Sequence, residues 1–174
     1  AQQRLDPPLR LTAFAVNLGV TPDARPRGQS GTVIINIDRW SNPAERAALL
    51  QAFRDKGPDG LRAALLETKR VGNIRTPDSI GWPLHYAHMV PAEDGGTQIF
   101  LATERRIAFW EAASNARTLD YPFTLVEIRI GPDGEGEGRL SLATKVTLSQ
   151  DGTNLRLENY ASEPVRLQSV RLDK

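Results

Sequence analysis

The chain contains no cysteine, only two histidines and only one methionine. Its formal net charge is only +1. The absence of cysteine excludes disulfide bonds, thiolate nucleophiles and thiolate metal sites, although it does not identify a cellular compartment. Because long-range attraction to phosphate backbones needs a net positive charge, we expect no nucleic-acid partner. No apolar run approaches the ~20 residues that a membrane-spanning helix needs, so we expect no membrane span.

The sequence also lacks the motifs of several enzyme classes. There is no Gly-x-Ser-x-Gly elbow, and both histidines fall on one predicted strand, which leaves little for a hydrolase triad. There is no Walker loop, and the glycines of the segment 134–138 belong to a predicted hairpin instead of a strand-to-helix turn, so a dinucleotide fingerprint is missing. We therefore assign no catalytic residue and expect no cofactor.

What the chain does contain is a series of short, alternating apolar runs. From Phe123 to Leu172 these runs are interrupted by Gly131-Pro132-Asp133-Gly134 and by Asp151-Gly152, a pattern that predicts an antiparallel β meander. Near its end, Val165 and Leu167 alternate in one phase and Val170 and Leu172 in the other, which predicts a β-bulge at Gln168-Ser169. Earlier runs predict strands over residues 9–17, 32–38, 70–76, 84–90 and 97–103, with a loop over 77–83.

One helical region interrupts the strands. Asn42-Pro43-Ala44-Glu45 combines an N-cap, a proline in the first turn and a carboxylate three residues after the cap, which predicts a helix start. Gly57-Pro58 ends that helix and begins a second one, so we expect a helical hairpin over Pro43 to Thr68. With 174 residues, 40% of them hydrophobic, the sequence predicts one α+β domain over residues 9–174, preceded by a flexible arm over residues 1–8. The predicted fold is a mostly antiparallel β sandwich or partial barrel of roughly eight strands with one helical hairpin.

Two patterns resemble metal sites without satisfying them. His85 and His88 lie three residues apart on a predicted strand, where odd spacing directs side chains to opposite faces. Asp133-x-Glu135-x-Glu137-Gly138 resembles the beginning of a calcium loop, but the twelfth position is Thr144 where a bidentate carboxylate is needed. We therefore assign no metal ligand and interpret the acidic turn from Gly134 to Gly138 as a soluble hairpin tip, leaving weak calcium binding there open.

Several stretches spread over most of the chain occur together: Thr12–Asn17, Asp38–Ser41, Gly72–Pro77, Phe109–Ala112, and Asp120–Thr124 through Leu140–Thr144. Together they resemble an uncharacterised family of exported, β-rich bacterial proteins of unknown function. The resemblance implies a signal peptide upstream and a periplasmic or extracellular location, and a chain that opens on Ala1-Gln2-Gln3 without a methionine agrees with this expectation. It implies no activity, cofactor or catalytic residue.

The remaining chemistry gathers in aromatic and arginine residues of irregular segments, which is typical of binding sites at the edge or mouth of a β structure. The leading hypothesis is an exported, non-catalytic domain that binds a small molecule or protein partner through six contacts: Arg75, Trp82, Tyr86, Arg106, Trp110 and Glu111. One alternative is a hydrolase or lyase that uses Glu104 or Glu111 as acid or base and therefore buries one of these carboxylates. A second alternative is a self-assembling structural protein, a homo-oligomer joined through the arm and an exposed strand edge.

Overall fold

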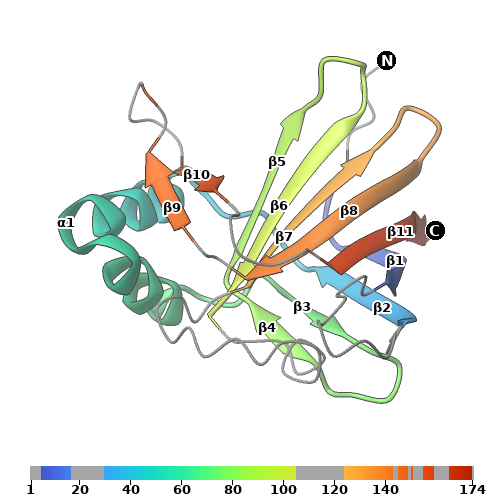
Figure 1. Ribbon diagram of the computed structural model, residues 1–174, viewed down its shortest axis with the longest axis horizontal. Helices are drawn as coiled ribbons and strands as arrows, with labels where there is room; N and C mark the ends of the chain where they lie inside the picture. The colour runs from blue at the N-terminus through green and yellow to red at the C-terminus, as the bar shows by residue number, and fades with distance from the viewer. Residues whose placement is uncertain are drawn as a thin grey trace, which may run out of the picture.

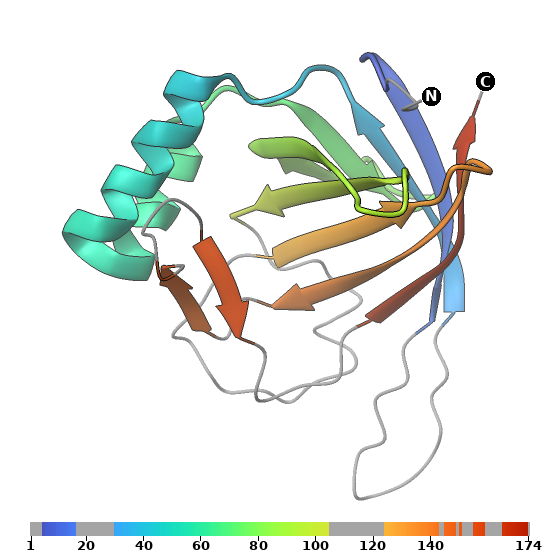
Figure 2. The same cartoon turned by 90° about the horizontal axis from the view of Figure 1, so that it is seen from above.

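The computed structural model describes residues 5–16, 30–104, 124–142, 145–148, 150, 155–158 and 165–173. Its dominant feature is a sheet of nine strands that curls into a nearly closed barrel, with the helical region on one side (Figure 1, Figure 2). In chain order the elements are β1 (Leu9–Val16), β2 (Ser30–Ile37), α1 (Pro43–Glu67), β3 (Gly72–Arg75), β4 (Trp82–Leu84), β5 (Tyr86–Pro91), β6 (Thr97–Thr103), β7 (Thr124–Ile130), β8 (Glu135–Leu142), β9 (Lys145–Leu148), β10 (Leu155–Glu158) and β11 (Val165–Asp173). β9 and β10 form a separate two-stranded ribbon near α1.

The sheet closes where the chain bends at His85. The strand order is β4-β3-β2-β1-β11-β8-β7-β6-β5, with every neighbouring pair antiparallel. The two ends of this order, β4 and β5, are consecutive in the chain: Leu84 accepts a hydrogen bond from Val71 beside β3, whereas the next residue, His85, donates its backbone N–H to Ala102 of β6. One bent strand therefore pairs with β3 on one side of His85 and with β6 on the other. We call this bend the seam.

This architecture confirms the mostly antiparallel β fold and refines two of its predicted elements. The sheet is barrel-like instead of a sandwich, and it has nine strands where the sequence predicted about eight in all. The strand predicted over residues 84–90 is divided at His85, and Trp82 and Pro83 belong to β4 although they were predicted to lie in a loop. Both differences arise from closure, since the bend lets one segment serve both ends of the sheet.

The inside of the barrel is packed with aliphatic side chains. Alternation along each strand directs every second residue inward, as Val33, Ile35 and Ile37 of β2 show, and the neighbouring Ile34 is only 7% exposed although it faces outward. The buried cluster draws on β1 to β8 and β11 and contains Leu5, Leu11, Ala13, Ala15, Val33, Ile35, Ile37, Val71, Ile74, Leu84, Ala87, Ile99, Leu101, Val126, Ile128, Ile130, Leu140, Val165, Leu167 and Val170. This interior is a packed core.

The predicted β-bulge in the last strand is confirmed. The register of β11 against β8 shifts between Leu167, which pairs with Gly138, and Val170, which pairs with Gly136. Ser169 absorbs the extra residue with a φ of 50°, a left-handed conformation that is uncommon outside glycine. Because of the bulge, Val165, Leu167 and Val170 are all buried despite their change of phase, and the partly buried Leu172 packs against the same core.

The helical hairpin is also confirmed. The Asn42 side chain accepts a hydrogen bond from the Glu45 backbone N–H, and the Glu45 carboxylate accepts one from the Asn42 backbone N–H, so the predicted capping box forms. Arg39 donates to the same carboxylate through both of its terminal nitrogens, Nη1 and Nη2, at 2.8 and 2.9 Å. At Gly57 the backbone leaves helical geometry, with φ 64° and ψ −149°, and divides α1 into a first limb before it and a second limb after it.

Both limbs pack on the outer face of the sheet beside the seam. Their buried leucines form a second apolar cluster with side chains that point away from the barrel interior on β5, β6 and β7. The cluster contains Leu49, Leu61, Leu65 and Ala102, with Phe53, Ala64, Tyr86 and Leu125 partly buried around it. The bent strand that contains the seam, which we call the seam strand, therefore lies between the barrel core on one face and α1 on the other.

The segment before β1 is partly fixed to the barrel. Leu5 is 2% exposed and belongs to the core, and its carbonyl accepts a hydrogen bond from the Trp40 indole N–H at 3.2 Å. Leu5 thus differs from the flexible arm that the sequence predicted over residues 1–8, because its side chain adds apolar contacts that a solvated arm would lack. The first four residues of that predicted arm lie outside the described residues.

Candidate functional site

A buried ionisable pair stands at the seam. His85 Nδ1 lies 2.7 Å from the carbonyl oxygen of Thr68, the C-cap residue of α1, and His85 Nε2 lies 3.2 Å from Glu104 Oε2 just after β6. The His85 side chain is 13% exposed and that of Glu104 only 5%. The imidazole therefore joins the end of the helix to the end of a barrel strand at the point where the sheet closes.

The partners of His85 determine where its protons lie. A carbonyl oxygen only accepts hydrogen bonds, so Nδ1 carries a proton and donates it to Thr68. Nε2 faces the Glu104 carboxyl, so both ring nitrogens are in contact with a polar partner. The histidine therefore links Thr68 to Glu104.

Hydroxyl groups extend the polar region into the end of the barrel. Thr103 and Thr124 are cross-strand partners on β6 and β7, and both are fully buried. The Thr103 hydroxyl lies 3.5 Å from Glu104 Oε2, at the limit of a hydrogen bond. This end of an otherwise aliphatic interior is thus polar, and burial makes each of its hydrogen bonds expensive to lose.

The second histidine has a cationic partner. Arg46 Nη1, from the first limb of α1, lies 2.7 Å from His88 Nδ1 and 2.9 Å from Nε2. An arginine only donates, so His88 accepts through an unprotonated nitrogen and is neutral. Burial lowers the pKa of His88 below its ordinary value, and the positive charge of Arg46 lowers it further.

Tyr86 lies between the two histidines on β5. Its ring centroid is 6.4 Å from that of His88, and it packs against the helix cluster. Burial raises the pKa of the Tyr86 phenol, and the charge of Arg46 opposes part of that rise. The phenol is therefore neutral at physiological pH.

A cleft of about 580 Å³ lies at the open end of the helical hairpin, and we call it the α1 cleft. Its lining combines small and apolar side chains with charged groups of both signs, namely Arg39, Asn42, Glu45, Ala48, Leu49, Ala64, Glu67, Thr68 and Lys69. Leu49 and Ala64 belong at the same time to the cluster that holds Tyr86, and the Thr68 carbonyl binds His85. Residues that line the α1 cleft are therefore in contact with the seam: Thr68 binds His85, and Leu49 and Ala64 belong to the cluster that contains Tyr86.

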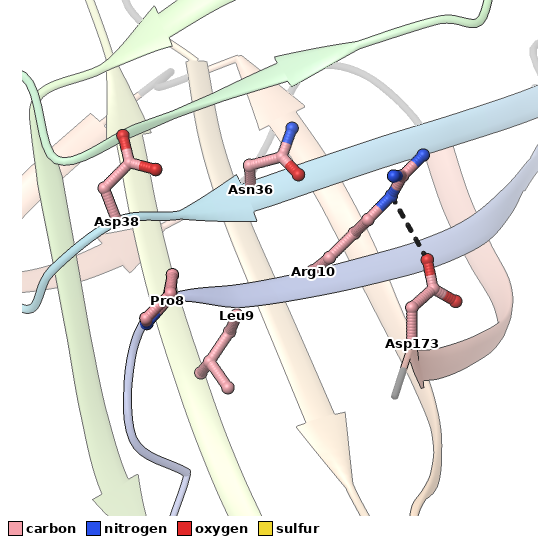
Figure 3. Close-up of a pocket in the computed structure, with 6 residues that line it drawn as sticks. All are labelled: Pro8, Leu9, Arg10, Asn36, Asp38 and Asp173. Atoms are coloured by element: carbon pink, nitrogen blue, oxygen red, sulfur yellow. Dashed lines mark ion pairs between the residues drawn. The ribbon is translucent and has the colours of Figure 1, made fainter.

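A second cleft, of about 420 Å³, opens on the outer face of β1 and β2 (Figure 3). It is lined by Pro8, Leu9, Arg10, Asn36, Asp38 and Asp173. Its charged groups are largely paired within the sheet: Arg10 Nε lies 3.3 Å from Asp173 Oδ2, and the Thr12 hydroxyl donates to the same oxygen at 2.7 Å. The Asn36 amide donates to Asn73 on β3 at 2.7 Å. These contacts stabilise strand pairing and leave a shallow polar surface.

Three of the six predicted ligand contacts lie within the described residues, and each of these three has different surroundings. Trp82 packs against the barrel core, whereas Tyr86 packs against the helix cluster, so these two aromatics lie in different apolar environments. Arg75 is half-buried on β3, where it pairs with Ile34 of β2. Arg106, Trp110 and Glu111 lie outside the described residues. Of the three described members, Tyr86 is the one that packs against α1 next to His85.

Sequence reasoning missed the partners that define the seam. Arg46 and Thr68 were taken only as helix residues, and His85 was considered only as a metal ligand or as a member of a hydrolase triad. Glu104 was considered as an acid or base, and it is buried as that alternative requires. No local pattern identifies these contacts, because 42 positions separate Arg46 from His88 and 17 separate Thr68 from His85.

Within the described residues, no three histidine or acidic side chains gather as a metal site would require. In the turn predicted as a soluble tip, Asp133 Oδ1 accepts the Glu135 backbone N–H at 3.2 Å, which is an ordinary turn contact. No described helix is long and apolar enough to cross a membrane.

Comparisons with family models, with curated proteins and with solved structures gave no match to this chain.

Proposed function

We propose that the protein is a non-catalytic binding domain that takes up a small molecule or a side chain of a protein partner in the α1 cleft. The observation that carries this proposal is the cleft itself, a hollow of about 580 Å³ with apolar side chains beside charged ones. Its volume falls in the range of known ligand sites, roughly 300–1,000 Å³. The packed aliphatic interior of the barrel directs binding to the outer surface.

The lining of the α1 cleft suits a ligand with an apolar body and a polar end. Ala48, Leu49 and Ala64 offer apolar contact from both limbs of the hairpin. Arg39 and Glu45 are already bonded to each other, and their hydrogen bond is the main reason that the pKa of Glu45 is lowered. Glu67 and Lys69 are exposed on the same rim. These two exposed charges are the groups best placed to pair with a polar ligand end.

The proton arrangement at the seam supports binding over catalysis. His85 uses one nitrogen on the Thr68 carbonyl and the other on Glu104, while His88 accepts from Arg46. A general base needs a nitrogen or carboxylate oxygen that reaches a substrate proton. Glu104 is directed at His85 and lines neither of the two clefts described above. We propose export to the periplasm or the outside of the cell on the resemblance alone.

A matched pair of substitutions tests the α1 cleft. Ala48 lines the cleft, whereas Ala47 is its exposed neighbour on the same limb and does not. A fragment library is screened against the wild-type protein by ligand-observed NMR, and the fragments that bind are then measured against Ala48→Trp and Ala47→Trp. We expect the first variant to weaken binding about tenfold or more, corresponding to ~1.4 kcal/mol, and the second to leave it unchanged.

Two results would contradict the proposal. Fragments that bind Ala48→Trp as tightly as the wild-type protein would place the ligand site elsewhere. A library from which nothing binds the wild-type protein would exclude small molecules of that kind as ligands of the cleft.

A further inference from the structure

Each of the two histidines holds one limb of α1 on the seam strand. His85 binds the Thr68 carbonyl at the end of the second limb, and His88 binds the Arg46 guanidinium of the first limb. Between the limbs lies Gly57, whose φ of 64° interrupts the helix. The first limb therefore has a polar attachment along its length that is separate from that of the second. Its N-terminal end is fixed independently, because Ser41 exchanges two hydrogen bonds with Ala87 of β5, at 2.8 and 3.0 Å.

The two attachments respond to a proton in opposite ways. Protonation of His85 preserves both of its contacts, because Nδ1 already donates to a carbonyl and a protonated Nε2 faces the Glu104 carboxylate. Protonation of His88 removes the lone pair that accepts from Arg46 and places two positive charges within about 3 Å of each other. One link survives in acid, and the other becomes repulsive.

The surroundings of His88 offer little compensation for the added charge. On its own strand the nearest ring is that of Tyr86, and the residue opposite on β6 is Phe100. The next position across, on β7, is Glu127, whose Oε2 is bound by Arg139 of β8 at 2.9 and 2.7 Å. The described groups that face His88 from its neighbouring elements are thus a cation, a neutral phenol, an apolar ring and a carboxylate already paired.

We propose that the two histidines form a pH-dependent clamp on α1, in which protonation of His88 releases the first limb from the sheet beyond its N-terminal end, which Ser41 holds, while His85 retains the second limb. The lowered pKa of His88 agrees with this geometry, because it reports that the clamped state disfavours the proton. Both limbs line the α1 cleft, so release changes the shape of the cleft. The effect of this change on ligand binding rests on the proposed function, but the movement of the first limb does not.

Distances between spin labels measure the movement directly. The chain has no native cysteine, so a pair of cysteines can be introduced for spin labelling and no other residue will react with the thiol-specific label. Ala47 on the first limb, Ala63 on the second and Glu93 in the β5–β6 turn are all exposed. Double electron–electron resonance on the pairs 47–93 and 63–93 is recorded without ligand at pH about 7.5 and about 5, either side of the ordinary histidine pKa. We expect the 47–93 distances to lengthen and broaden in acid and the 63–93 distances to stay unchanged.

Two variants show whether His88 and Arg46 cause the change. His88→Gln keeps a hydrogen-bond acceptor that cannot be protonated, and Arg46→Gln removes the opposing cation. Each should abolish the acid response of the 47–93 pair. An unchanged 47–93 distance in the wild-type protein, an equal change in His88→Gln, or a change in both pairs together would overturn the proposal. Because no ligand is present, failure here is distinct from failure of the fragment experiment.

Discussion

The buried pair at the seam makes a quantitative prediction about Glu104. Its carboxylate is 5% exposed and lies 3.2 Å from His85 Nε2, so Glu104→Ala leaves that nitrogen without its carboxylate partner. Leaving a buried polar group unsatisfied costs about 1–3 kcal/mol, and more where the group is charged. We expect about 3 kcal/mol, because Glu104 is almost fully buried, whereas His85 is 13% exposed and water can reach part of its ring.

Glu104→Gln separates the hydrogen bond from the charge. The glutamine amide donates to an unprotonated His85 Nε2, while Nδ1 continues to donate to Thr68. The expected cost is about 1 kcal/mol, the size of one altered hydrogen bond. At about 2–4 °C per kcal/mol for a domain of this size, Tm falls by about 6–12 °C for Glu104→Ala and by about 2–4 °C for Glu104→Gln.

Thermal and urea unfolding followed by circular dichroism measure both variants, with Glu93→Ala as the control. Glu93 is exposed in the β5–β6 turn, and its replacement should change the free energy of unfolding by less than about 0.5 kcal/mol. If Glu104→Ala costs no more than this control, the pair contributes nothing to closure of the barrel. If the alanine and glutamine variants lose the same stability, the reasoning about the shared hydrogen bond is wrong.

Two further predictions concern α1. Because the pKa of His88 is lowered in the folded state, the unfolded chain binds more protons in acid, and the free energy of unfolding should fall as pH drops from about 6.5 toward the folded-state value. Urea titrations across pH should show that His88→Gln lacks this part of the loss, and a variant with the full wild-type dependence would contradict the assignment. Asn42→Ala removes the helix cap and should cost about 1 kcal/mol, whereas Asn42→Asp keeps the acceptor and should cost much less; equal losses in urea unfolding would exclude a capping role.

The elements that sequence reasoning identified correctly are those governed by neighbours in the chain. The helix start needed only Asn42 and Glu45, three residues apart, and the break needed only Gly57 and Pro58. The bulge could be inferred from the change of phase after Leu167 because a core must receive every apolar side chain. Each of these features follows from periodicity or from a local hydrogen bond.

The candidate site could not be inferred in the same way. Its contacts join residues from α1, the seam and the end of β6, and each depends on where the sheet closes. Sequence reasoning grouped Trp82 with Tyr86 because both are aromatic and close in the chain, yet the bend at His85 separates them into the barrel core and the helix cluster. Glu104 attracted attention as a carboxylate, but its histidine partner was recognisable only after β5 and β6 were paired.

The sequence by itself determined the alternation of the strands, the cap and break of the helical hairpin, and the absence of thiol chemistry, because these depend on residue type and short spacing. Tertiary structure alone decided that the sheet curls into a barrel, that one strand bends to serve both of its ends, and that the two histidines receive partners of opposite character. The physical reason is that the choice of strand partners depends on how much apolar surface the whole core buries, and not on any one local segment. A side chain at the closure point therefore takes its partner, its solvent exposure and its protonation from segments far away in the chain.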